Sequence, residues 1–139
     1  NNRNFNAEFM LVSELKEDRK FELAYCNGVF HHIPPAERNK AVQYIAKRLH
    51  INGIFSLWEN NPWNPGTKYI MRRVPFDRDA ILLPPTAARD LVTTNGFEIV
   101  RIDFLFFFPA FLGFFRKFEP YLTPLPFGAQ YQILCRFKG

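Results

Sequence analysis

Two apolar segments in the first half of the chain have the length and composition of strands. Residues 21–26 are almost wholly apolar, which is typical of a strand covered on both faces of a parallel sheet, and residues 54–58 form a second strand candidate. Between them, after Pro35, the apolar residues of the range 41–49 recur at helical spacing. A strand, a helix and a second strand with short connections predict a right-handed parallel crossover unit.

Further strands are predicted on either side of this unit. Residues 9–12 form a short apolar run, and residues 97–108 alternate imperfectly between apolar and polar side chains. Residues 130–137 alternate more strictly, as in an edge or near-edge strand. No clear helix separates the last two segments, so we expect them to form an antiparallel hairpin that closes the sheet. The pattern as a whole predicts an α/β fold.

Turn residues mark the ends of the predicted helices. Asn52-Gly53 should end the first helix in the left-handed conformation. A short helix is predicted at residues 67–73, inside a polar, proline-rich region. Thr86 is placed to cap a third helix at residues 87–94.

Composition limits the class of protein and of partner. The chain has 139 residues, 47% hydrophobic and 22% charged, which fits one packed domain and excludes wholesale disorder. Lys and Arg outnumber Asp and Glu by 18 to 13, but the basic residues are scattered, in pairs at most. A nucleic-acid surface would gather them in one stripe, so no nucleic-acid partner is expected. The 17 Phe residues call for a large core, a lipid-like pocket or a partner surface.

Cysteine usage and the lengths of the apolar runs indicate a cytoplasmic protein without a transmembrane segment. Cys26 and Cys135 both lie in apolar, strand-like segments, where free thiols in a reducing compartment are more common than a disulfide framework. The longest apolar run, residues 104–115, contains Pro109 and Gly113. It is shorter than the stretch of about 20 residues that crosses a bilayer.

Eight short segments resemble a known family in their order along the chain. They are residues 21–24, 29–34, 49–55, 59–65, 76–80, 95–97, 125–131 and 131–137. Together they resemble the C-terminal two-thirds of a class I S-adenosylmethionine-dependent methyltransferase. The resemblance implies a Rossmann-like sheet, mostly parallel with an antiparallel C-terminal hairpin, in which strand seven lies between strands five and six. Residues 9–12 would be strand three of that sheet, and residues 21–26 strand four.

The family's glycine-rich cofactor loop has no counterpart here, since no G-x-G occurs in the chain. The acidic residue that binds the ribose hydroxyls is missing as well. The resemblance therefore implies a single, truncated methyltransferase-like domain over residues 1–139 that lacks the N-terminal strands. Such a domain would hold half of an S-adenosylmethionine site.

Four residues are candidates for contact with that cofactor. Asn27 and Gly28 follow a predicted strand, at the strand end where open α/β sheets bind ligands. The resemblance places them beside the methionine part of S-adenosylmethionine, although Asn-Gly also makes an ordinary turn. Ser13 and Glu14 would lie near the adenine, with a solvated loop as the alternative.

Three residues are candidates for catalysis. Either His31 or His32 could act as a general base, because the unperturbed pKa of histidine is about 6.5; the alternative is a helix-entry residue bonded to the backbone. Adjacent side chains on an extended backbone point in opposite directions, so no metal site is expected from this pair. Glu59 ends a strand at the same mouth. It could bind the substrate or fasten the following Asn- and Pro-rich loop through backbone N–H groups.

Three further residues are candidates for binding the acceptor. Asn61 and Trp63 follow Glu59 in the same loop. Arg78 stands between two aspartates, where it could hold an anionic substrate group or form an ion pair that fixes the loop. The Phe-rich residues 104–115 fit either a buried strand with an elbow or an exposed apolar lid or interface.

Two functions follow from these features. The first is methyl transfer from S-adenosylmethionine to a small organic acceptor, with an apolar or lipid-linked acceptor as one option. The second is a non-catalytic module that binds a partner through its sheet edge or its Phe-rich patch. If the neighbour of residues 23–26 is missing, that edge is also a route to a homo-oligomer.

Overall fold

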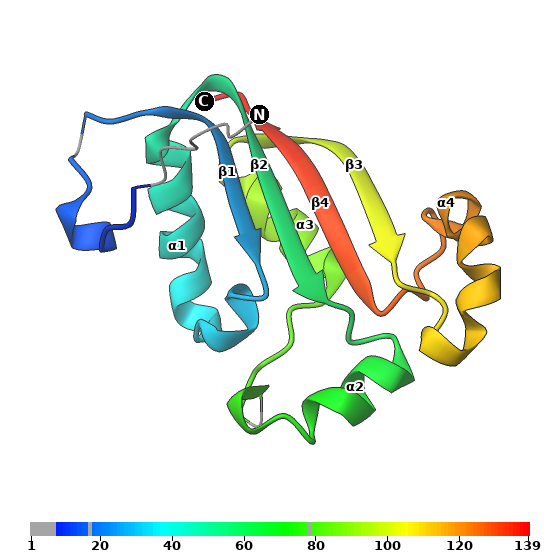
Figure 1. Ribbon diagram of the computed structural model, residues 1–139. Coiled ribbons are helices and arrows are strands. Elements are labelled where there is room, and N and C mark those ends of the chain that lie inside the picture. The colour runs from blue at the N-terminus through cyan, green and yellow to red at the C-terminus, as the bar shows by residue number, and fades with distance from the viewer. Residues whose placement is uncertain (1–7, 17, 78) are drawn as a thin grey trace, which may run out of the picture.

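The computed structural model describes residues 8–16, 18–77 and 79–139. Four strands form one sheet in the order β1-β2-β4-β3 (Figure 1). They are β1 (Phe21–Asn27), β2 (Leu49–Asn60), β3 (Phe97–Leu105) and β4 (Gln130–Phe137). β1 and β2 are parallel, and β4 runs antiparallel to both β2 and β3. β1, β2 and β3 share one direction and β4 alone is reversed, which confirms the predicted α/β sheet with an antiparallel C-terminal hairpin.

The last strand of the chain lies inside the sheet. β4 is inserted between β2 and β3, with Ile54 opposite Arg136 on one side and Phe97 opposite Phe137 on the other. This is the position that the methyltransferase resemblance implied for the C-terminal strand. The order of the last four strands is therefore confirmed.

Helices and 3-10 segments connect the strands, and two of the helices pack on one face of the sheet. The helices are α1 (Pro35–Arg48), α2 (Pro65–Met71), α3 (Pro85–Thr94) and α4 (Glu119–Leu122), and the 3-10 segments are η1 (Val12–Glu14), η2 (Phe30–His32), η3 (Pro75–Asp77) and η4 (Ala110–Phe118). Val42 of α1 and Val92 of α3 are fully buried in one core with Phe55, Ile133 and Cys135 of the sheet. Figure 1 shows α3 behind the strands. Among the described residues, no helix has both the length and the apolarity needed to cross a bilayer.

Two strand predictions need correction. Residues 9–12 are not a strand: Leu11 donates its N–H to Glu14 Oε2 at 2.7 Å at the start of η1, and Phe9 is 95% exposed. No described strand lies beside this segment, so its apolar side chains have no sheet face to cover. β3 ends at Leu105 rather than at Phe108, because Phe106 has a φ of 61° and an extended strand cannot continue through the left-handed region.

β1 is less buried than its apolar sequence suggested. It forms one edge of the described sheet and pairs only with β2. Leu23 and Tyr25 are 59% and 60% exposed, so the expectation of a strand buried on both faces is wrong here. The side chains on this face include an edge-to-face pair, Tyr25 and Trp58, with ring centroids 6.5 Å apart.

The helix ends also differ from the predicted ones. α3 begins at Pro85 behind Pro84, with no side-chain cap, so Thr86 does not cap it. The reason is that Pro at the first helical position has no N–H that needs an acceptor. α1 passes directly into β2, and the left-handed Asn52 (φ 68°) therefore lies inside β2 rather than after the helix.

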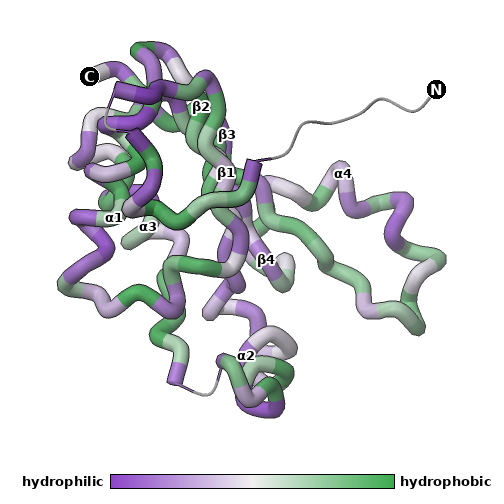
Figure 2. Tube along the Cα trace, turned by 60° about the vertical axis from the view of Figure 1, so that its left-hand side comes forward, coloured by the Kyte–Doolittle hydropathy of each residue, from purple (hydrophilic) through white to green (hydrophobic). Residues whose placement is uncertain are grey.

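The Phe-rich segment divides into a buried part and an exposed part. Phe104 is 7% exposed in β3, whereas Phe111 and Phe114 of η4 are 83% and 74% exposed. Figure 2 shows this segment standing away from the sheet, with apolar residues along much of its length. The buried-strand interpretation holds up to Phe104, and the exposed-patch interpretation holds from Phe111 onward.

Gly128 provides a test of the packing between β3 and the loop before β4. A Cβ atom at this position would lie 2.5 Å from both Leu105 N and Leu105 O. We expect Gly128→Ala to lower the free energy of unfolding by about 1–3 kcal/mol, since the backbone must move to relieve the overlap. Urea denaturation measures this free energy. Gly113→Ala is the matched control, because a Cβ there meets nothing within 4 Å; equal midpoints for the two variants would contradict this packing.

Candidate functional site

The carboxyl ends of the parallel strands β1 and β2 lie side by side at one end of the sheet, its carboxyl edge. Open α/β sheets bind ligands at this end. β1 ends at Asn27, which pairs with Trp58. Gly28 has a φ of +65° and donates its N–H to Trp58 O at 3.0 Å. The chain therefore leaves the sheet in a tight turn and enters η2 beside Glu59, the next residue of β2.

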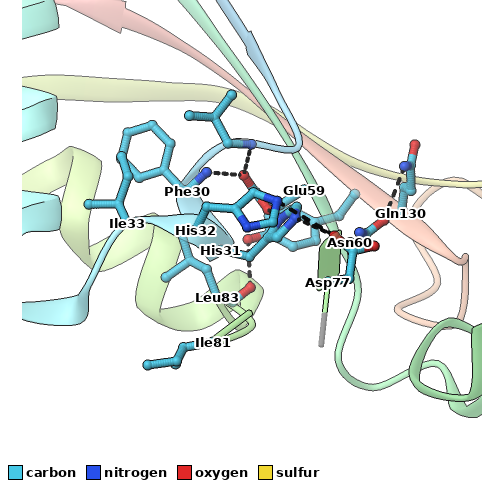
Figure 3. Close-up of polar contacts among 12 residues, drawn as sticks. Phe30, His31, His32, Ile33, Glu59, Asn60, Asp77, Ile81, Leu83 and Gln130 are labelled. Carbon is cyan, nitrogen blue, oxygen red and sulfur yellow. Dashed lines mark hydrogen bonds and ion pairs between the residues drawn. The ribbon is translucent and has the colours of Figure 1, made fainter. Parts of the chain in front are cut away.

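Glu59 holds this turn in place. Its side chain is fully buried, and Oε1 accepts the N–H of Val29 at 3.0 Å and that of Phe30 at 2.7 Å (Figure 3). Oε2 lies 2.6 Å from Nδ1 of His31. Charged hydrogen bonds of this kind offset the cost of burying a carboxylate. Glu59 was expected to accept hydrogen bonds from backbone N–H groups of the loop after β2. It accepts them instead from the segment after β1.

The two histidines of η2 both approach Asp77 of η3. Nε2 of His31 lies 3.4 Å and Nε2 of His32 lies 3.5 Å from Asp77 Oδ1, and the ring centroids are 4.2 Å apart. The expectation that the rings diverge assumed an extended backbone. Because η2 is a 3-10 turn, the rings lie side by side, and that argument against a shared metal ion fails.

The two rings differ in burial and in charge environment. The side chain of His31 is 3% exposed, and its hydrogen bond to Glu59 is the main cause that raises the pKa of the imidazole. Burial opposes this shift, while the charges of Glu59 and Asp77 add to it. The side chain of His32 is 44% exposed. His32 is therefore the ring that a ligand can reach, and His31 is held between two carboxylates.

Arg38 was not among the sequence candidates, yet it fixes the other side of η2. Its Nε donates to Phe30 O at 3.1 Å and to Ile33 O at 3.0 Å, and Nη2 donates to Ile81 O. Ile81 in turn donates its N–H to His31 O at 2.9 Å. The residue is 6% exposed. Arg38 is therefore a structural residue that joins η2 to the segment after η3.

Asn61 and Trp63 are not brought to the histidines. Asn61 is fully buried, donates to Pro126 O and Gly128 O at 3.0 and 2.8 Å, and accepts the N–H of Trp63 at 3.0 Å. Its amide thus ties the loop after β2 to the loop before β4. Trp63 stacks on Phe104, with ring centroids 6.4 Å apart.

A cavity of about 450 Å³ lies next to Asp77, within the size range of small-molecule sites. Its walls include apolar Ile70, Met71 and Phe106 and polar Asn60, Asp77 and Gln130. Gln130 Nε2 donates to Asn60 Oδ1 at 3.1 Å. Sequence reasoning stopped at Glu59 and Asn61 and missed Asn60, although Asn60 stands between them.

The candidate cofactor residues are separated in space. Asn27 and Gly28 lie at the carboxyl edge, beside Glu59. Ser13 and Glu14 are exposed in η1, which lies along α1 (Figure 1), where Tyr44 Oη donates to Val12 O at 3.4 Å. The structure does not bring Ser13 and Glu14 to the end of β1.

One sequence candidate and the two cysteines remain. Arg78 lies outside the described residues. Cys26 and Cys135 are free, and burial raises the pKa of Cys26 to about 11 and that of Cys135 to about 12. Both thiols are therefore protonated at neutral pH and are poor nucleophiles.

No family model matches this chain, and no curated protein matches it. Solved structures do match. An S-adenosylmethionine-dependent methyltransferase from Archaeoglobus fulgidus aligns with a TM-score of 0.67 at 13% identity, over 86% of this chain and 61% of that chain. A methyltransferase from Thermotoga maritima, described as a possible histamine N-methyltransferase, aligns with a TM-score of 0.66 at 14% identity, over 88% of this chain and 58% of that chain.

The magnesium protoporphyrin IX methyltransferase from Synechocystis, solved with bound S-adenosylhomocysteine, aligns with a TM-score of 0.55 at 19% identity. The alignment covers 93% of this chain and 49% of that chain. The chain thus spans less than two-thirds of the length of each of these proteins. At such identities the likeness concerns the fold. Over most of its length, this chain has the fold of the class I S-adenosylmethionine-dependent methyltransferases.

Proposed function

We propose that the carboxyl ends of β1 and β2 form the acceptor side of an S-adenosylmethionine-dependent methyl-transfer site. The observation that carries this proposal is the cluster of Glu59, His31, Asp77 and His32, which lies at that edge beside a cavity. The fold supports the choice of cofactor, since a neighbour of the same fold was solved with S-adenosylhomocysteine. Fold alone does not establish an activity, so the cluster bears most of the weight.

The chemistry needs a positioned nucleophile more than a reactive protein group. The acceptor atom forms a bond to the methyl carbon as the sulfur–carbon bond breaks, and S-adenosylhomocysteine leaves. Holding the acceptor in line supplies much of the acceleration. A hydroxyl or ammonium acceptor must also lose a proton, and His32, whose side chain is 44% exposed, offers Nε2 to take it. His31 and Glu59 act as positioning residues, because neither lines the cavity: Glu59 binds the backbone of η2, and His31 lies between Glu59 and Asp77.

The cavity favours an acceptor that is largely apolar with one polar end. Ile70, Met71 and Phe106 supply the apolar wall, and Asn60 and Gln130 supply amide groups. A small organic acceptor, including one with a lipid tail, matches this combination.

Cofactor binding should be weak in this chain on its own. Asn27 and Gly28 can meet the methionine part of S-adenosylmethionine, but the 139 residues contain no G-x-G loop to approach the rest of it. We expect calorimetry on the 139-residue chain to show a dissociation constant weaker than about 1 mM, the upper end of ordinary working levels. Binding near 1 μM would contradict the assignment of the site to half of a cofactor pocket.

Transfer of a labelled methyl group tests the proposal as a whole. The protein produced from its whole gene is incubated with methyl-labelled S-adenosylmethionine and with small acceptors that carry a hydroxyl, amine or thiol on an apolar body. We expect label in the acceptor and an equivalent amount of S-adenosylhomocysteine. Tight S-adenosylmethionine binding without transfer to any of these acceptor classes would contradict it.

A second function is favoured by the exposed edge of β1. Leu23 and Tyr25 are more than half exposed on a strand that pairs on one side only in the described sheet. Such an edge recruits another strand. In this reading the chain is a non-catalytic module that associates with a second copy of itself.

The oligomeric state of the 139-residue chain tests the second function. We expect light scattering to show species larger than the monomer that increase with concentration, and we expect Leu23→Lys to reduce them, because a charged edge resists pairing. Ile70→Lys is the matched control, since Ile70 is 61% exposed in α2, outside the sheet. A monodisperse monomer at every concentration would show that the edge does not self-associate.

A further inference from the structure

We propose that His31, His32 and Asp77 bind a divalent metal ion, with Zn²⁺ the best fit. Each residue offers one ligand atom, and these atoms lie within 4.8 Å of one another. Figure 3 shows the two imidazoles and Asp77 converging from separate segments, η2 and the end of η3. Two imidazole nitrogens and one carboxylate oxygen are a donor set that suits zinc.

The distances between Asp77 and the two histidines match a tetrahedral site. Zinc binds histidine nitrogen and carboxylate oxygen at about 2.0–2.1 Å, so two ligand atoms of a regular tetrahedron are about 3.4 Å apart. Asp77 Oδ1 lies 3.4 Å from Nε2 of His31 and 3.5 Å from Nε2 of His32. All three ligand atoms lie within 4.8 Å of one another, and the His32 side chain, 44% exposed, is the less confined of the two rings.

The ring of His31 is held in the orientation that a metal ligand needs. Its Nδ1 lies 2.6 Å from Glu59 Oε2, which leaves Nε2 directed toward Asp77. Metal-bound histidines commonly donate their second nitrogen to a carboxylate in this way, which fixes the tautomer and the ring plane. Glu59 is itself fixed by two backbone N–H groups of η2. The support for His31 is therefore present without the ion.

The charges around the cluster favour a cation. Glu59 and Asp77 contribute two carboxylates, and Arg38 contributes one positive charge near Glu59. With both imidazoles neutral, these groups leave a net negative charge in a largely buried place. A divalent ion between the rings and Asp77 would offset it.

Three protein ligands leave one position of a tetrahedral ion open, as in catalytic zinc sites. Asp77 also borders the cavity, so an acceptor oxygen or nitrogen could occupy that position. This role rests on the proposed methyl transfer: His32 Nε2 would then be a ligand rather than a base. The ion would lower the pKa of the bound acceptor group, whose proton passes to water.

Metal titration of the protein produced from its whole gene tests the site. After treatment with a chelator and its removal, we expect Zn²⁺ to bind at one ion per chain by calorimetry, and Co²⁺ to give the visible absorption of a tetrahedral site. His32→Ala and Asp77→Asn should each weaken binding at least 10-fold, and Glu59→Gln about 10–100-fold. His50→Ala is the control, because His50 is exposed at the start of β2. Circular dichroism checks that each variant is folded.

The outcomes separate the two proposals. Absence of saturable Zn²⁺ and Co²⁺ binding by the folded protein would overturn the metal site. Binding that survives both His32→Ala and Asp77→Asn would also overturn it, because the ion would then lie elsewhere. Metal binding without methyl transfer would uphold the site and contradict the proposed function. Methyl transfer that persists in the presence of the chelator would uphold that function. It would contradict the role of the ion in the reaction and would leave His32 as the proposed base.

Discussion

Replacing Glu59 by alanine should be the most destabilising single change at the site. We expect the free energy of unfolding to fall by about 3–5 kcal/mol, the cost of removing one partner from a buried charged group. The N–H groups of Val29 and Phe30 would lose their acceptor, and the His31 ring would lose its nearest carboxylate. Urea denaturation followed by tryptophan fluorescence measures the change.

Glu98→Ala is the matched control for this variant. Glu98 also lies on a strand and forms an ion pair with Lys138 at 3.1 Å, but its side chain is 62% exposed. Exposed ion pairs contribute at most about 1 kcal/mol, so this variant should unfold near the wild-type midpoint. If the two variants were equally stable, Glu59 would not hold η2 as the structure indicates.

His32→Ala should have the largest effect on catalysis. We expect turnover to fall by about 10²–10⁴-fold, the usual contribution of a group that handles a proton. The affinity for S-adenosylmethionine should change little, because the His32 ring faces Asp77, which borders the cavity proposed for the acceptor. Initial rates and calorimetry on the protein produced from its whole gene give the two quantities.

His50→Ala again serves as the control, since it removes an exposed histidine from the opposite end of β2. Its turnover should equal that of the wild type. Loss of cofactor binding in folded His32→Ala would make His32 part of the scaffold. Equal turnover in His32→Ala and His50→Ala would show that His32 takes no part in the methyl transfer.

Much of the sheet could be predicted because its signals are local. The apolar residues 54–58 and the alternating residues 130–137 fall inside β2 and β4. The errors arose where long-range contacts decide the outcome. Residues 9–12 have the composition of a strand but no described strand to pair with. β1 has the composition of a central strand but lies at the edge of the described sheet.

The candidate site was predicted in part for the same reason. Gly28 and Glu59 could be placed at one edge, because parallel strands with a short crossover bring their carboxyl ends together. Asp77 could not, since the loop that carries it returns to η2 through tertiary contacts such as Ile81 N–H to His31 O. The shared position of the two histidines depended on a 3-10 turn that the hydrophobic pattern does not signal.

The location of the site is the central claim, and amide chemical shifts test it most directly. Spectra of the ¹⁵N-labelled protein, produced from its whole gene, are compared with and without S-adenosylhomocysteine. We predict the largest shifts at Asn27 and Gly28, smaller ones at His31 and His32, and none in η1 or at Gly96, which lies near the amino end of β3. Unchanged shifts at Asn27 and Gly28 while S-adenosylhomocysteine binds elsewhere would contradict the account.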